Sequence, residues 1–66
     1  MRRYIIVKAT RDSNTPYAGP TCRRAGVKPG QVFRNKRAAH RVARKLSAFN
    51  PVGFKVREQL PVLLAG

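Results

Sequence analysis

Residues 35–51 read NKRAAHRVARKLSAFNP, and this stretch decides the fold because its apolar and basic residues alternate with a helical period. At about 100° per residue, one half of the predicted cylinder carries Ala38, Ala39, Val42, Ala43, Leu46 and Phe49. The other half carries Lys36, Arg37, His40, Arg41, Arg44 and Lys45. Asn35 is a favoured N-cap residue and Pro51 cannot continue a helix, so we expect a helix from Lys36 to about Ala48.

Two strand-forming stretches precede this helix. Residues 4–10, YIIVKAT, combine an aromatic residue with β-branched residues and predict a strand. Alternation places one set of side chains on one face, Ile5, Val7 and Ala9, and the other set on the opposite face, Tyr4, Ile6 and Lys8. Residues 31–34, QVFR, predict a second, short strand with Val32 and Phe33 as its apolar members.

Residues 11–30 are rich in Ser, Asn, Thr, Pro and Gly, which favour turns and oppose regular ladders. They predict a long turn-rich loop with a short hairpin around Asp12 to Thr15. A connection of this length within one domain is usually either functional or disordered.

A third strand is expected after the helix, at Phe54–Glu58, with Phe54 and Val56 facing inward and Lys55 and Arg57 outward. The predicted order of strand, loop, strand, helix and strand is an α+β fold, in which one basic amphipathic helix packs on a small antiparallel or mixed sheet. The 66 residues leave room for a single domain, 1–66. It ends in a short apolar tail at 60–66, expected to cover a sheet edge, with a docking peptide as the alternative.

The charge of the chain points to its partners. Fifteen Lys and Arg residues stand against only Asp12 and Glu58, which gives a formal net charge of +13. Such a field opposes compaction by self-repulsion and attracts polyanions. The expected partner is therefore nucleic acid or an acidic protein surface.

Catalysis and cofactor binding are not expected, because the inventory of reactive groups is small. Cys22 and His40 are each the sole residue of their type, so neither a disulfide framework nor a zinc cage can form within the chain. His40 lies among arginines, and Cys22 lacks the phosphatase loop arginine, because Lys28 stands six residues on. We expect no enzyme activity, no cofactor, no metal and no small-molecule substrate.

Location follows from similar observations. The first apolar run, Ile5 to Val7, is shorter than a signal peptide requires, and residues 60–66 are too short to cross a bilayer. The predicted helix has no Trp, and its apolar half is mostly Ala and Val, so membrane binding ranks last among the alternatives. We expect a cytoplasmic protein, in the host cytoplasm if a phage encodes it.

The binding surface is expected on the basic half of the helix. Arg37, Arg41 and Arg44 stack in one line there, flanked by Lys36 and Lys45. Like charges at these spacings repel, and a helix face of a single sign favours a polyanion partner over mere solvation. The remaining candidate contacts are Arg23, Arg24 and Lys28 in the loop and Arg57 on the last strand.

Contact with DNA or RNA phosphates is the leading hypothesis for this surface. Neutralising about five to eight phosphates predicts a log–log salt slope of about −5 to −7. No recognised DNA-binding motif or paired aromatic signature for single strands is present. Tyr17 is the one loop aromatic that suggests base stacking.

A resemblance suggests a second hypothesis. The stretch Asn50-Pro51-Val52-Gly53-Phe54-Lys55-Val56, followed by Pro61, resembles the end of the small podovirus inhibitors of host RNA polymerase. The resemblance implies a small sheet with one helix, and a transcription inhibitor that docks on the jaw of the bacterial RNA polymerase β′ subunit. The contact arginines of that family fall on Glu58 and Leu60 in an ungapped alignment, and Arg57 lies one place off. The family's helix is acidic whereas this one is basic, which implies a different contact surface.

Overall fold

The fold is α+β. The computed structural model describes residues 2–11 and 13–60. Along this part of the chain the elements are strand β1 at Tyr4–Lys8, helix α1 at Thr21–Ala25, helix α2 at Lys36–Ser47 and strand β2 at Phe54–Glu58. The amphipathic helix and the last strand therefore lie where the sequence predicted them.

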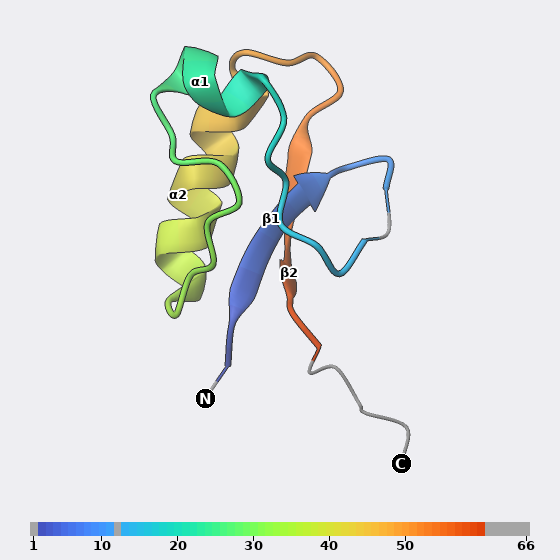
Figure 1. The fold of residues 1–66 in the computed structure, drawn as a ribbon, viewed down its shortest axis with the longest axis vertical. Coiled ribbons are helices and arrows are strands. Elements are labelled where there is room, and N and C mark those ends of the chain that lie inside the picture. Colours follow the sequence, from blue (N-terminus) through green and yellow to red (C-terminus); the bar gives the residue numbers. More distant parts are fainter. Residues whose placement is uncertain (1, 12, 61–66) are drawn as a thin grey trace.

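Strands β1 and β2 pair antiparallel, with Tyr4 opposite Glu58 and Lys8 opposite Phe54. Helix α2 packs on one face of this ribbon, and the segment after β1 passes on the other side (Figure 1). A two-stranded ribbon is at best marginally stable by itself. Its stability here depends on cover from both sides.

The core lies between α2 and the ribbon. Its buried members form one cluster: Ile6, Cys22, Phe33, Ala39, Ala43 and Leu46. Phe54 and Val56 pack against this cluster from β2, as their inward positions predicted. Two predicted apolar-half residues do not join it, because Ala38 is exposed and Phe49 is 50% exposed. The helix ends at Ser47, so the helical period no longer governs the direction of Phe49.

The second face of β1 is also buried. Ile5 is 0% exposed and Val7 is 2% exposed, although both point away from α2. The cover comes from the segment after β1, where Ser13 O accepts a hydrogen bond from Arg57 Nη1 at 2.9 Å. Asn14 fixes the same segment to the end of β2, since Leu60 N donates to Asn14 Oδ1 at 2.9 Å. The apolar run Ile5 to Val7 is therefore that of a strand covered on both faces.

The predicted strand at 31–34 is wrong. Phe33 makes an isolated bridge with Tyr4, with N–O distances of 2.7 and 2.8 Å, and no strand continues from it in the described chain. Pro29 and Gly30 precede this stretch, and Asn35 caps α2 directly after it. The chain therefore has room for only one pairing before it must turn into the helix.

The predicted loop at 11–30 holds a short helix that the sequence analysis missed. Helix α1 follows Pro20 and ends at Gly26, whose φ of 71° is left-handed and suits glycine. The hairpin predicted around Asp12 to Thr15 involves Asp12, which lies outside the described residues. Beyond it, Thr15 N donates to Ser13 Oγ at 3.1 Å, which forms a local turn. The tail expected at 60–66 lies outside the described residues except for Leu60, which is exposed.

The two ends of α2 are fixed by side chains. Asn35 Oδ1 accepts from Arg37 N at 2.8 Å, which confirms the predicted N-cap. After the helix, Gly53 N donates to Asn50 O at 3.1 Å and closes a turn. Ser47 Oγ accepts from Phe54 N at 3.1 Å and so joins the helix end to the start of β2.

Candidate functional site

The exposed side of α2 carries a cluster of basic side chains. We call it the α2 basic face, and it comprises Lys36, Arg37, Arg41, Arg44 and Lys45, all of which are exposed. The first turn of α2 contains no acidic residue. Within the described chain these five side chains make no hydrogen bond or ion pair, so their charges remain available to a partner.

The core fixes the direction of this face. Ala39 is 0% exposed, Ala43 5% and Leu46 2%, so the opposite side of the helix must point to solvent. Arg44 and Lys45 lie in the last turn, where cations interact favourably with the helix dipole. Lys36 and Arg37 lie at the unfavourable end, and the Asn35 cap offsets part of that cost.

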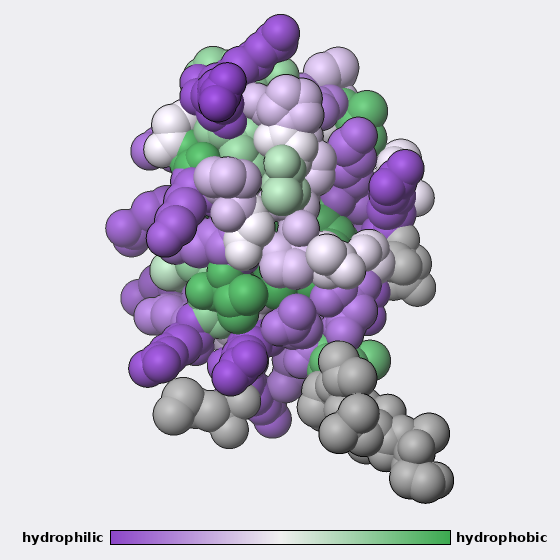
Figure 2. All heavy atoms as spheres, in the orientation of Figure 1, coloured by the Kyte–Doolittle hydropathy of each residue, from purple (hydrophilic) through white to green (hydrophobic). Residues whose placement is uncertain are grey.

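The predicted loop cations lie on the α1 side of this helix. Arg23 and Arg24 are exposed in the last turn of α1, which contacts α2. Asn50 Nδ2 donates to Thr21 Oγ1 at 3.4 Å and holds α1 at the carboxyl end of α2. Lys28 lines a small cavity together with Val42 and Leu46 of α2. Hydrophilic side chains accordingly project along the α2 edge and around the α1 end of the molecule (Figure 2).

Arg57 lies elsewhere. It is paired with Ile5 in the ribbon and therefore points away from α2. Its guanidinium is half-buried and donates to Ser13 O, so it fastens the covering segment to β2. The structure thus separates Arg57 from the other predicted contact residues.

Acidic side chains neutralise few of the cations in the described chain. Within the described chain the only ion pair joins Arg2 Nε to Glu58 Oε1 at 3.7 Å, and both side chains are well exposed. Exposed pairs of this kind contribute little, about 0–1 kcal/mol. The positive field around α2 is therefore not compensated by neighbouring carboxylates in the described chain.

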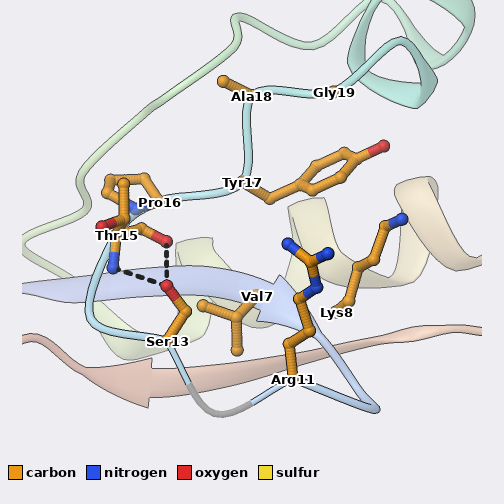
Figure 3. Close-up of a pocket in the computed structure, with 9 residues that line it drawn as sticks. All are labelled: Val7, Lys8, Arg11, Ser13, Thr15, Pro16, Tyr17, Ala18 and Gly19. Atoms are coloured by element: carbon orange, nitrogen blue, oxygen red, sulfur yellow. Dashed lines mark hydrogen bonds between the residues drawn. The ribbon is translucent and has the colours of Figure 1, made fainter.

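A hollow of about 310 Å³ lies between the end of β1 and the segment that covers it. The side chains of Lys8 and Arg11 rise from its base toward the ring of Tyr17, and Ser13, Thr15 and Pro16 form another wall (Figure 3). Lys8 Nζ lies 5.8 Å from the centre of the Tyr17 ring. No pattern in the sequence marks Lys8 or Arg11, because only the return of the chain over β1 brings them beside Tyr17.

Tyr17 serves the core, whereas the sequence suggested base stacking. Its ring centre lies 4.7 Å from that of Phe54 at an angle of 58°, and its hydroxyl donates to Thr21 Oγ1 at 3.1 Å. Its backbone N–H also donates to Ile6 O at 2.8 Å. Tyr17 therefore links the edge of β1, β2 and the start of α1.

The two candidate reactive residues have different surroundings. Cys22 is 2% exposed, and burial raises the pKa of its thiol, which opposes formation of a thiolate. His40 is exposed on α2 and lines a groove with Arg44. In residues 2–11 and 13–60, His, Cys, Asp and Glu side chains nowhere gather in a group of three or more that could hold a metal ion.

Comparison with known proteins adds no relative to this description. No family model, curated protein or solved structure matches the chain. Neither α1 nor α2 is long and apolar enough to cross a membrane, and the structure describes no other helix. The exposed side chains are therefore the guide to function.

Proposed function

We propose that the protein is a non-catalytic nucleic-acid-binding protein, which contacts DNA or RNA phosphates through the α2 basic face. The observation that carries the proposal is that five exposed cations on one helix lack an internal partner in the described chain. Arg23, Arg24 and Lys28 extend the contact on the α1 side. A phosphate backbone supplies the regular row of anions that such a surface matches.

Like charges on a helix oppose folding by a few tenths of a kcal/mol per pair, and the first turn of α2 adds an unfavourable dipole term. Polyanion binding relieves both terms, because each phosphate neutralises a cation that is otherwise repelled by its neighbours. The α2 basic face together with the α1 side carries eight exposed cations: Arg23, Arg24, Lys28, Lys36, Arg37, Arg41, Arg44 and Lys45. Engagement of about five to seven of them predicts a duplex salt slope of about −4.5 to −6.

The test measures affinity for a duplex and for a single strand of mixed sequence across a range of NaCl concentrations. Replacing Arg41 and Lys45 by glutamine removes two charges from the α2 basic face. We expect the double variant to lower the magnitude of the salt slope by about 2 and to weaken binding to all sequences alike.

The matched control replaces Arg3 and Arg11 by glutamine. It removes the same net charge from exposed residues outside α2, and we expect the salt slope to stay within about half a unit of the parent. Equal reductions of the salt slope in both variants would show that net charge, and not the α2 basic face, governs binding. Binding that is absent or insensitive to salt would refute the proposal.

An acidic protein partner, such as the bacterial RNA polymerase implied by the resemblance, is the competing outcome. Capture from a bacterial lysate after nuclease treatment separates the two, because a protein complex survives the treatment and bridging by nucleic acid does not. Retention of one protein by the parent, and its loss with Arg41→Glu plus Arg44→Glu, would replace nucleic acid with that partner.

A further inference from the structure

A groove of about 660 Å³ runs between α2 and β2, on the side of α2 that is turned toward β2. Its α2 wall includes His40, Ala43 and Arg44, and its β2 wall is the strand from Phe54 to Val56. Ala43 and Val56 make its base apolar, whereas His40 and Arg44 supply polar and positive groups at its rim.

The backbone of β2 borders this groove with unpaired groups. Ala9 N donates to Gly53 O and Gln59 N donates to Arg3 O, so the odd-numbered residues of β2 direct their backbone toward β1. Phe54, Val56 and Glu58 therefore direct theirs to the outer edge. Phe54 N is satisfied by Ser47 Oγ, but no described residue pairs with the N–H and C=O of Val56 or the N–H of Glu58.

The opposite edge of the ribbon, that of β1, is closed by backbone hydrogen bonds. On that side, Phe33 exchanges two hydrogen bonds with Tyr4, and Tyr17 N donates to Ile6 O. The described chain thus closes the β1 edge and leaves the β2 edge open beside a groove. An open edge with alternating donors and acceptors is a template for an added strand.

We propose that this groove binds an extended acidic peptide segment of a partner protein, which adds as a third strand to the outer edge of β2. Side chains of an added strand alternate between the two faces of the sheet. On one face they meet His40 and Arg44 across the apolar base, and on the other they meet Lys55, which points away from α2. A strand that alternates glutamate with valine therefore places its valines over Ala43 and Val56 on the α2 face and its glutamates against Lys55 on the other.

Other occupants match the groove less well. A second copy of the chain, paired through its own β2, would bring two molecules of net charge +13 together. Nucleic acid offers phosphate acceptors for the N–H groups, but a DNA backbone has no donor for the C=O of Val56 and an RNA backbone has only its 2′-hydroxyl groups. The alternating edge is matched by a polypeptide backbone.

The test uses the full chain, labelled with ¹⁵N, and an eight-residue peptide of alternating glutamate and valine. We expect the peptide to shift the amide signals of Val56 and Glu58 and to slow their hydrogen exchange at least tenfold. A peptide of alternating lysine and valine should bind at least tenfold more weakly. Val56→Pro removes the outward N–H, a change that edge strands tolerate, and should weaken binding at least tenfold.

Two controls keep the outcome decisive. Arg41→Gln, on the outward side of α2, should leave peptide affinity within twofold. If Val56→Pro unfolds the chain, the same glutamate–valine peptide with every backbone nitrogen methylated replaces it, and should bind at least tenfold more weakly than the unmethylated form. Equal binding of the methylated peptide would overturn strand addition, because side-chain charge alone would then account for affinity.

Two further results would also overturn the proposal. Protection of the Val56 amide that rises with protein concentration in the absence of peptide would assign the edge to a second copy. Protection of the same amide by duplex DNA would assign it to nucleic acid. Loss of peptide binding with intact salt-dependent DNA binding would leave the function proposed for the α2 basic face unaffected.

Discussion

Gly19 is the position at which the smallest side chain should have a large effect. A Cβ atom built on Gly19 would lie 2.3 Å from Tyr17 Oη and 2.5 Å from Tyr17 Cζ, far inside van der Waals contact. The φ angle of Gly19 is not among the positive ones, so the strain in Gly19→Ala comes from the tyrosine ring and not from the backbone. The ring cannot retreat easily, because it packs against Phe54 and its hydroxyl is bonded to Thr21.

The size of the destabilisation depends on whether the added methyl group is overpacked or the Tyr17 ring is displaced. Overpacking of a filled site costs about 1–3 kcal/mol. Displacing the ring instead would forfeit a hydrogen bond of about 1 kcal/mol and an aromatic pair of about 0.5–1.5 kcal/mol. Both routes lead to a loss of about 2 kcal/mol in the free energy of unfolding for Gly19→Ala, a large share of the stability of a small domain.

Urea unfolding followed by circular dichroism measures this loss, and a double-mutant cycle identifies its cause. In a Tyr17→Ala background the ring is absent, so Gly19→Ala should be neutral or stabilising by up to about 1 kcal/mol, through the reduced entropy of the unfolded chain. The coupling between the two positions should therefore be about 2–3 kcal/mol. An equal cost in both backgrounds would refute the steric explanation and the role of Tyr17 as the link between the strands and α1.

Two other residues allow sharp predictions. Asn35→Ala should lower the free energy of unfolding by about 1 kcal/mol, because Arg37 N loses its acceptor. Asn35→Asp should restore this stability and add a dipole contribution of about 0.3–1 kcal/mol. Urea unfolding measures both variants, and equal stabilities of the alanine and aspartate forms would contradict the prediction. Burial raises the pKa of the Cys22 thiol, so the folded state keeps a proton that the unfolded state loses. Stability should therefore be unaffected at neutral pH and fall as the pH rises above the ordinary thiol pKa. Reaction of Cys22 with a disulfide reagent at pH 8 should follow the rate of unfolding, and reaction of the folded protein at the rate of a free thiol would contradict this.

The elements predicted correctly are those whose pattern repeats. Helix α2 is long enough for its period to separate buried Leu46 from exposed Arg41, and β2 is bounded by Gly53, whose φ is 80°. Helix α1 escaped prediction because its five residues are too few to show a period. Pro20 and Gly26, at its two ends, favour turns equally well when no helix lies between them.

The site was predictable to the extent that it lies on α2. Exposure of the α2 basic face follows from burial of the opposite side, so the sequence period contained the information. The position of Arg57 could not be predicted from a sequence period. Alternation along β2 shows which residues share a face, but not that residues 13–15 return to cover the face of Ile5 and capture the arginine.

Both proposals have a common origin in the small size of the sheet. Two strands leave four surfaces to satisfy: α2 takes one face, the segment after β1 takes the other, and Phe33 and Tyr17 close the edge of β1. The described chain has no further segment for the edge of β2, and the helix that covers the first face turns its charges outward. Repulsion among those charges opposes folding, and the unpaired groups of the β2 edge are a template for another strand. Ligands that bind only the folded state shift the equilibrium toward it, so a polyanion on α2 and a peptide on β2 would each stabilise the fold where the described residues leave charges or strand groups without a partner.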